Sequence, residues 1–264
     1  MSGRRADIEL VGRGLFTSRE KARAAILAGA VKADGHPVTK AGQPLRPDAV
    51  IELAERARYV SRGGQKLEGA LQTFGLDVSG MRALDVGAST GGFTDCLLQH
   101  GAASVVALDV GYGQLAWSLR NDPRVTVLER TNIRGADPVA VGAPFDVVVV
   151  DVSFIGFGAV LPHLLAMAGD GGRVIGLVKP QFEAGKGRVG KKGVVRDAAV
   201  HASVLDAVVG AVEAAGWVVR GMTFSPLKGP EGNIEFWVWL APCGERTTVA
   251  PVDVVSAAHA ALGE

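Results

Sequence analysis

The chain has 264 residues, of which 48% are hydrophobic and 21% charged, a composition typical of one large or two smaller globular domains. No run of 18 apolar residues occurs, the arginine-rich start lacks an apolar core, and the two isolated cysteines, Cys96 and Cys243, are too few for a disulfide framework or a zinc site. These features argue against a membrane span, a signal peptide and a bound metal, and we expect a cytoplasmic protein.

Charge is unevenly distributed along the chain, although the net charge is only +1. Residues 1–66 carry 13 Lys and Arg against 7 Asp and Glu, giving +6, whereas the remainder carries 15 against 20, giving −5. Such asymmetry indicates that the amino-terminal part meets a polyanion. The alternative is a solvated basic surface without a partner.

Residues 4 to about 58 have the pattern of a compact α+β unit. A first helix is predicted from apolar residues at helical spacing, namely Ile8, Leu10, Val11 and Leu15. Ser18 can cap a second, alanine-rich helix over 19–28, and short strands are predicted at 30–33 and 50–53.

Positive charge at the start of the second helix opposes the helix dipole, which is easier to explain if phosphate is the partner. The segment Leu-Phe-Thr-Ser-Arg-Glu-Lys-Ala-Arg, followed by Ile-Leu-Ala-Gly-Ala-Val-Lys-Ala-Asp-Gly, resembles the alpha-L RNA-binding motif, the small domain of the ribosomal small-subunit protein four type. The resemblance implies binding to structured RNA. The residues expected to contact it here are Arg4, Arg19, Lys21 and Arg23.

A connector follows the small unit. Residues 55–64 are charged, have no apolar period and end in two glycines. We therefore expect an RNA-binding domain at 1–58, a linker at 59–64 and a large domain at 65–264, whose first helix begins at Gln65.

After Gly80 the chain alternates strands and helices, which predicts an α/β domain with a mostly parallel sheet. The expected strands are Arg82–Val86, Ser104–Asp109, Arg124–Leu128, Asp146–Asp151, Arg173–Lys179, Trp217–Phe224 and Ile234–Leu240. A Pro/Gly-rich loop joins the last two, so we expect them to form an antiparallel hairpin at one edge.

The first strand runs into the glycine-rich segment Asp-Val-Gly-Ala-Ser-Thr-Gly-Gly-Phe-Thr-Asp, which lets the backbone approach a ligand closely at the start of a helix. Its spacing fits neither a dinucleotide fingerprint nor a P-loop. Asp109, at the end of the second strand, lies where a carboxylate accepts both hydroxyls of an adenosine ribose. The pattern resembles the S-adenosylmethionine site of the Rossmann-like methyltransferases, with Asn132 reaching the adenine edge. The expected cofactor contacts are Asp85, Gly87, Ala88, Ser89, Thr90, Gly91, Phe93, Asp109 and Asn132.

Four charged residues, Lys66, Asp151, Lys179 and Glu235, lie in or at the ends of apolar predicted elements. A charge at the carboxyl end of a buried strand is costly unless it is paired or used. Singly, each has an ordinary explanation: Lys66 as a helix-surface lysine, or Glu235 as an edge-strand charge that discourages aggregation.

Together the four residues resemble the Lys-Asp-Lys-Glu tetrad of the FtsJ-type ribose 2′-O-methyltransferases. The resemblance implies in-line transfer of a methyl group to a positioned 2′-hydroxyl, with Lys179 beside that hydroxyl. Burial and Lys66 favour a neutral Lys179 that acts as general base. Asp151 and Glu235 favour a charged Lys179 that stabilises the developing alkoxide, and both roles remain open.

A glycine-rich basic segment, 185–196, follows Lys179 and suggests a loop that closes on RNA phosphates. Its expected RNA contacts are Lys186, Arg188, Lys191 and Lys192. Phe182 could stack an unpaired base. The alternative is a basic turn without a ligand.

The small domain, the segment Tyr-Val-Ser-Arg-Gly-Gly-Gln-Lys-Leu, the glycine-rich segment and Leu-Val-Lys-Pro-Gln-Phe-Glu together resemble the TlyA family, over residues 4 to 241. That resemblance implies S-adenosylmethionine-dependent 2′-O-methylation of cytidines in bacterial rRNA. A helical tail after Glu245 favours the members that modify both 16S and 23S rRNA, in the 30S and 50S subunits. The Arg-x-Trp-Val of long members is replaced here by Ala57-Arg-Tyr-Val60, which leaves linker coupling to the cofactor open, with Arg56 and Tyr59 as substitutes.

Three other functions are considered as alternatives to ribose methylation of rRNA. The family is also called haemolysin, which suggests a membrane-active protein, but the sequence has neither a span nor a strongly amphipathic segment. An RNA-binding module without catalysis would not need the tetrad and the cofactor loop. A base methyltransferase would more naturally carry an Asn/Asp-Pro-Pro-Tyr motif or a catalytic cysteine.

Overall fold

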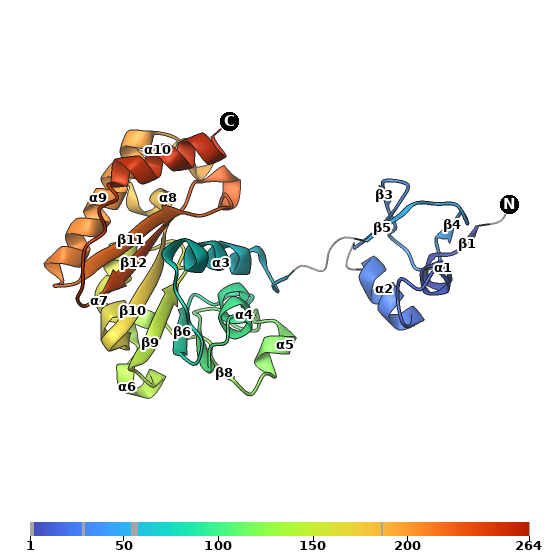
Figure 1. The fold of residues 1–264 in the computed structure, drawn as a ribbon, viewed down its shortest axis with the longest axis horizontal. Helices are drawn as coiled ribbons and strands as arrows, with labels where there is room; N and C mark the ends of the chain where they lie inside the picture. Colours follow the sequence, from blue (N-terminus) through green and yellow to red (C-terminus); the bar gives the residue numbers. More distant parts are fainter. Residues whose placement is uncertain (1–2, 28–29, 54–57, 186, 264) are drawn as a thin grey trace. The chain divides into compact units, whose positions relative to one another are not determined.

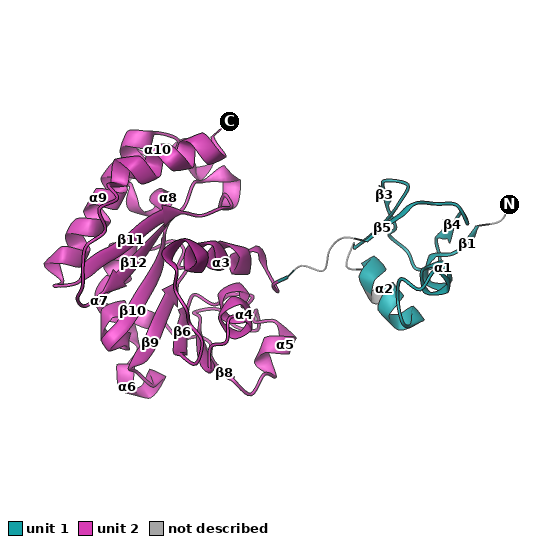
Figure 2. Ribbon diagram, in the orientation of Figure 1, with its two compact units in different colours: residues 1–58 teal, residues 59–264 magenta. Residues whose placement is uncertain are grey.

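A computed structural model of the protein describes residues 3–27, 30–53, 58–185 and 187–263 (Figure 1). The chain divides into two compact units, Met1–Arg58 and Tyr59–Glu264 (Figure 2). Each unit has a hydrophobic core of its own.

The small unit packs two helices against short strands. Its elements are β1 (Arg4–Arg5), α1 (Ala6–Gly12), α2 (Arg19–Leu27), β2 (Val31–Ala33), β3 (His36–Pro37), β4 (Pro44–Leu45) and β5 (Ile51–Leu53). Ser18 caps α2, because its Oγ accepts the N–H of Lys21 at 3.3 Å. Leu10, Ile26 and Val31 form the centre of the core. The two expected helices and the strands at β2 and β5 are confirmed, but α1 ends at Gly12, before Leu15, and residue 28 of the second expected helix lies outside the described residues.

The large unit is built on a seven-stranded sheet of order β11-β12-β10-β9-β6-β7-β8. Its strands are β6 (Arg82–Val86), β7 (Ser104–Leu108), β8 (Val125–Leu128), β9 (Phe145–Val150), β10 (Ala168–Val178), β11 (Val218–Phe224) and β12 (Phe236–Ala241). β6 to β10 run parallel, and β12 is antiparallel to both β10 and β11. The predicted α/β class and the antiparallel edge hairpin are confirmed.

Helices cover both faces of this sheet. They are α3 (Arg62–Phe74), α4 (Gly92–Gln99), α5 (Trp117–Arg120), α6 (Pro138–Val141), α7 (Phe157–Met167), α8 (Pro180–Glu183), α9 (Ala198–Ala214) and α10 (Pro251–Leu262), with single turns η1 (Ile133–Gly135), η2 (Lys191–Gly193) and η3 (Pro230–Gly232). One core lies under α3 and α4, and the other under α7, α9 and α10 (Figure 1). Val147 to Val150 of β9 are all buried and contribute alternately to the two cores, as expected for a central parallel strand.

Two details differ from the sequence-based expectations. The helix expected from Gln65 begins at Arg62, because Ser61 caps it by accepting the N–H of Gly63 at 3.3 Å. Gly64 is not part of a linker. It lets the start of this helix pack closely against the Tyr59 ring, since a Cβ at this position would lie 2.2 Å from that ring.

The second difference concerns Glu235, which does not lie on an edge strand. β12 begins one residue later, at Phe236, and is enclosed between β10 and β11. Protection of a sheet edge therefore does not explain this carboxylate.

Candidate active site

The four charged residues singled out in the sequence meet at one edge of the large sheet. β9 and β10 are parallel neighbours, so Asp151 and Lys179 lie side by side, each one residue beyond the end of its strand. β12 runs antiparallel to β10, which brings its amino end, and with it Glu235, to the same edge. Lys66 reaches this edge from α3.

The four side chains form two ion pairs. Lys66 Nζ lies 2.5 Å from Glu235 Oε2, and Lys179 Nζ pairs with Asp151 Oδ1. Lys179 also donates to Ser153 Oγ at 3.0 Å. Glu235 is fully buried, and each lysine is only 8% exposed. Removing one partner of such a pair leaves an uncompensated charge, so each pair depends on both of its members.

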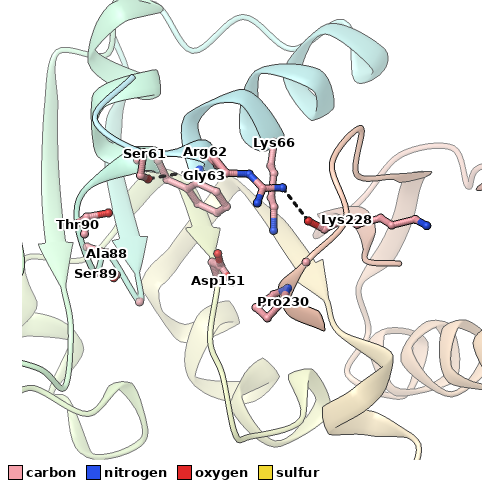
Figure 3. Close-up of a pocket in the computed structure, with 14 residues that line it drawn as sticks. Ser61, Arg62, Gly63, Lys66, Ala88, Ser89, Thr90, Asp151, Lys228 and Pro230 are labelled. Carbon is pink, nitrogen blue, oxygen red and sulfur yellow. Dashed lines mark hydrogen bonds between the residues drawn. The ribbon is translucent and has the colours of Figure 1, made fainter. Parts of the chain in front are cut away.

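A cavity of about 550 Å³ opens beside these pairs. Figure 3 shows the start of α3 on one side of it and the segment from Lys228 to Pro230 on the other, with Lys66 and Asp151 extending between them. Arg62 joins the two sides by donating to the carbonyl oxygen of Lys228 at 3.1 Å. The lining consists of Ser61, Arg62, Gly63, Lys66, Gly87, Ala88, Ser89, Thr90, Gly92, Phe93, Asp151, Lys228, Gly229 and Pro230.

The glycine-rich loop between β6 and α4 forms the floor of this cavity. Gly87 has φ +86°, and a Cβ there would lie 2.3 Å from the carbonyl oxygen of Asp151. At Gly92 a Cβ would lie 2.2 Å from Ser61 Oγ. Neither position can hold a side chain without displacing its neighbours, so these glycines let the loop lie directly against α3 and the end of β9.

A second cavity of about 500 Å³ lies on the other side of the loop, and the two cavities share Gly87, Ser89 and Asp151. Asp109 and Asn132 both line the second cavity, as the adenosine site predicted from the sequence requires. Asp109 Oδ2 accepts the N–H of Ser89 at 2.7 Å, which ties the loop to the end of β7. Of these two cavities, Asp151 lines both and Asp109 only the second, and the close-packed glycine loop borders each of them. This arrangement fits an elongated nucleoside such as S-adenosylmethionine.

Asp85 and Gly91 line neither of these cavities. Asp85 is fully buried, and its Oδ2 accepts the N–H and the hydroxyl of Thr94 at 2.9 and 2.7 Å. Burial raises its pKa to about 7, and Asp151 adds to that rise, against the lowering by the Thr94 hydrogen bonds. The structure thus gives Asp85 a role in holding α4 to β6, and so in supporting the loop.

Comparison with known proteins agrees with this geometry. Residues 59–241 match the family model of the FtsJ-like methyltransferases, and residues 4–51 match the S4 domain. A 16S/23S rRNA (cytidine-2′-O)-methyltransferase TlyA from Mycobacterium tuberculosis is 50% identical over 263 residues, which are 98% of this chain and 97% of that protein. The chain belongs to the TlyA family of FtsJ-like methyltransferases. Membership implies S-adenosylmethionine as the methyl donor.

Two further relatives of this TlyA-family chain carry the haemolysin name. Hemolysin A of Brachyspira hyodysenteriae is 40% identical, over 88% of this chain and 97% of that protein. The solved structure of a hemolysin from Streptococcus thermophilus has a TM-score of 0.76 and 42% identity, and covers 99% of this chain and 97% of that one. Within the described part of the chain, no helix has the length and apolarity needed to cross a bilayer.

The sequence reasoning missed several residues of this TlyA-family site. Phe154 is 92% exposed, lines the second cavity and has φ +65°, which is rare for a bulky residue. Its ring lies 5.3 Å from that of Phe182, centre to centre. Arg62 and Lys228 were missed too, and the only signal was their position beside glycines.

The expected RNA contacts of the S4 domain differ in their surroundings. Arg19 and Arg5 both pair with the buried Asp7, at 2.9 and 3.1 Å, and Arg5 is the main cause that lowers the pKa of Asp7 to about 2. Arg19 therefore has a structural partner, and its place at a helix start does not itself require phosphate. Lys21 and Arg23 are exposed, and Arg4 lies 3.9 Å from a carboxylate oxygen of Glu9.

In the basic segment after α8, Lys186 lies outside the described residues. Arg188 donates to Ser203 Oγ at 3.1 Å, and Lys192 is exposed with φ +69°. Lys191 begins the turn η2. Over the described ranges, no group of three His, Cys, Asp or Glu residues is arranged to hold a metal ion.

Proposed function

We propose that this chain transfers the methyl group of S-adenosylmethionine to the 2′-hydroxyl of cytidines in ribosomal RNA. The observation that carries the proposal is that the buried Lys66–Glu235 pair and the partly buried Lys179–Asp151 pair lie beside two cavities with shared lining residues, at the ligand-binding edge of the sheet. The substrate class is taken from the M. tuberculosis relative, a 16S/23S rRNA (cytidine-2′-O)-methyltransferase.

The second cavity would hold the adenosine of the cofactor. Asp109 lies at the end of β7, where it can accept the ribose hydroxyls, and Asn132 lies in the same cavity for the adenine edge. The first cavity, at the start of the 13-residue helix α3, would take the methionine end, whose carboxylate suits the N–H groups of a helix start. Gly87, Ser89 and Asp151, shared by both cavities, would then surround the sulfonium, which supplies the electrophilic methyl group.

The hydroxyl oxygen of the target ribose must bond to the methyl carbon as the carbon–sulfur bond breaks, and the hydroxyl proton must leave. Of the two roles considered for Lys179, its ion pair with Asp151 supports the charged one, in which Nζ orients the hydroxyl and stabilises the developing alkoxide. The proton then passes to water at the mouth of the cavity. Lys66, fixed by Glu235, adds a second positive charge beside the same cavity.

The RNA would be held by the S4 domain and by the basic segment after α8. Phe154 is exposed, and the half-buried Phe182 packs against it beside Asp151, so this aromatic pair is suited to stacking the target base outside its helix. We infer that both 30S and 50S subunits are substrates, because the tail forms α10, whose Val254, Val255 and Ala258 are buried against the large unit. The chain thus has the carboxyl-terminal extension expected of members that act on both subunits.

Methyl transfer from labelled S-adenosylmethionine to unmodified 30S and 50S subunits tests the proposal, with primer extension at low nucleotide concentration to locate the product. Stops at a cytidine in each subunit are expected. A stop in the large subunit alone would retain the enzyme and reject the interpretation of α10. No incorporation into either subunit or into free rRNA would reject the function.

A further inference from the structure

Three large apolar side chains lie exposed on one segment at the cofactor edge of the sheet. Val110, Tyr112 and Trp117 are 68%, 67% and 77% exposed, and all follow the carboxyl end of β7 within residues 110–117. Arg130, two residues beyond the end of β8, lies over the ring of Tyr112. These four residues are called the aromatic–arginine rim below.

The backbone of the rim is fixed by polar contacts. Asp109 Oδ1 accepts the N–H of Gly111 at 2.6 Å, and Glu129 Oε1 accepts the N–H of Gly113 at 2.8 Å. Glu129 also pairs with Arg120 at the end of α5. Arg120, and more weakly Gly113, lower the pKa of Glu129, so this anchor is charged at neutral pH. The exposed aromatic side chains therefore belong to an ordered segment.

Tyr112 and Arg130 form a preorganised stack. The guanidinium carbon of Arg130 lies 4.3 Å from the centre of the Tyr112 ring. The backbone N–H of Arg130 donates to the carbonyl oxygen of Gly111 at 3.0 Å. Arg130 has φ +54°, a conformation that costs free energy in a residue other than glycine. Arg130 is exposed, and among the described residues no carboxylate lies within ion-pairing distance of it. Its charge acts on Glu129 only at longer range, as the weakest of the causes that lower the pKa of that carboxyl, so the guanidinium can still meet an anionic ligand.

We propose that the aromatic–arginine rim binds unpaired nucleotides of the RNA substrate at a distance from the methylated ribose. This inference rests on the proposed function. Bases stack on aromatic rings and guanidinium planes, while a cation attracts the phosphate, and the rim presents both together. β7 is three strands from β10 in the sheet, and neighbouring strands are about 4.8 Å apart, so the rim lies roughly 14 Å or more from Lys179. The rim therefore contacts a nucleotide other than the target.

The observations favour RNA over a lipid surface. Binding to a bilayer needs a continuous apolar face, whereas the apolar residues here alternate with Gly111, Gly113 and the Arg130 guanidinium. The cofactor does not explain the rim either. Val110 lines the second cavity, but Tyr112 and Trp117 line neither cavity.

The test uses the full chain with Tyr112→Ala, Trp117→Ala and Arg130→Ala. Tyr112→Phe keeps the ring, and Val139→Ala is a matched control, because Val139 is 82% exposed on α6, before the amino end of β9. Binding to unmodified 30S and 50S subunits is measured across a series of salt concentrations, together with the Kd for S-adenosylmethionine and the kcat of methyl transfer. Vesicles of phosphatidylcholine and phosphatidylglycerol at three to one serve as the lipid probe.

We expect Tyr112→Ala and Trp117→Ala each to weaken subunit binding roughly 5- to 100-fold, as for loss of one stacked base, with kcat and cofactor affinity unchanged. Their salt dependence should equal that of wild type, whereas Arg130→Ala should reduce the salt slope by about 1. Tyr112→Phe and Val139→Ala should behave as wild type.

Three results would overturn the inference while the wild type still methylates rRNA: unchanged subunit binding in the alanine variants, loss of cofactor affinity alone, or vesicle binding that depends on Trp117. If the wild type instead transfers no methyl group but the rim variants still lose RNA affinity, the proposed function fails and the rim inference stands.

Discussion

Neutralising the two members of the Lys66–Glu235 pair, singly and together, separates a structural role for this pair from a chemical one. The variants are Lys66→Met, which keeps most of the stem, Glu235→Gln, which keeps the shape, and the double variant. Removing one partner of a buried ion pair costs about 3–5 kcal/mol of stability, because the other charge is left buried and unpaired. Replacing both partners with neutral groups of similar volume is often close to neutral.

The burial of the two residues makes the single variants unequal. Glu235 is fully buried, whereas Lys66 is 8% exposed and lines the cavity, where water can reach its Nζ. Lys66→Met therefore leaves the less accessible charge and should cost more than Glu235→Gln. For a unit of the size of residues 59–264, each kcal/mol shifts Tm by about 2–4 °C, so Lys66→Met should lower Tm by roughly 6–20 °C.

Tm is measured by thermal unfolding, and single-turnover methyl transfer to rRNA is measured on the same preparations at a temperature below the lowest Tm. Together the two measurements separate loss of stability from loss of chemistry. We expect both single variants to lose methyl transfer. The double variant should regain most of the Tm lost in Lys66→Met and yet remain inactive. If activity returns together with stability in the double variant, the pair only supports the fold, and the mechanism proposed for Lys66 is wrong.

Three further predictions follow from the same contacts. Lys179→Ala should abolish methyl transfer, measured by methylation of the subunits, while leaving subunit affinity, measured by filter binding, near that of wild type. Retained methyl transfer in this variant would show that Lys179 takes no part in the chemistry. Glu183 accepts the N–H of Phe157 and so joins the segment after β10 to the start of α7, which follows β9. Glu183→Ala should therefore lower kcat about tenfold or more with little change in KM. Glu183→Gln keeps an acceptor oxygen and should have a kcat near that of wild type. Equal losses in both variants would show that this contact does not position the site. Because the pKa of Asp85 is raised to about 7 in the folded state, its contribution to stability should fall as pH rises from about 4 to 7, by at most about 4 kcal/mol. Denaturant titrations at each pH give the free energy of unfolding as a function of pH, and Asp85→Asn should flatten this dependence between about pH 4 and 7. The same dependence in the variant and the wild type would refute the shift.

The sequence predicts much of the fold because the large unit follows strong local patterns. Val147 to Val150 are apolar without alternation, which is the pattern of a strand buried on both faces, and the structure places them at the centre of the sheet. The polar residues that end such strands, Asp109, Asp151 and Lys179, lie one residue beyond the strands, at the edge where ligands bind.

What the sequence could not supply is contact information at long range. Gly63 and Gly64 have the composition of a linker, and only their neighbours show that they belong to a tightly packed helix start: Phe93 lies against Gly63, and the Tyr59 ring against Gly64. Arg19 at a helix start suggested a phosphate, because the buried Asp7 with which it pairs lies on another helix. A local pattern reports on the element that contains it and says nothing about the partner from another element.

The arrangement of the tetrad adds a constraint on folding that a single cluster of charges would not have. Lys66 and Glu235 are 169 residues apart, on the first helix of the large unit and just before its last strand. Asp151 and Lys179 follow adjacent parallel strands and can pair as soon as β9 and β10 associate. The Lys66–Glu235 pair depends on the pairing of β12 with β10, because this pairing brings Glu235 to the edge that α3 reaches. The tetrad is therefore complete only when α3, β9, β10 and β12 are all in their native places.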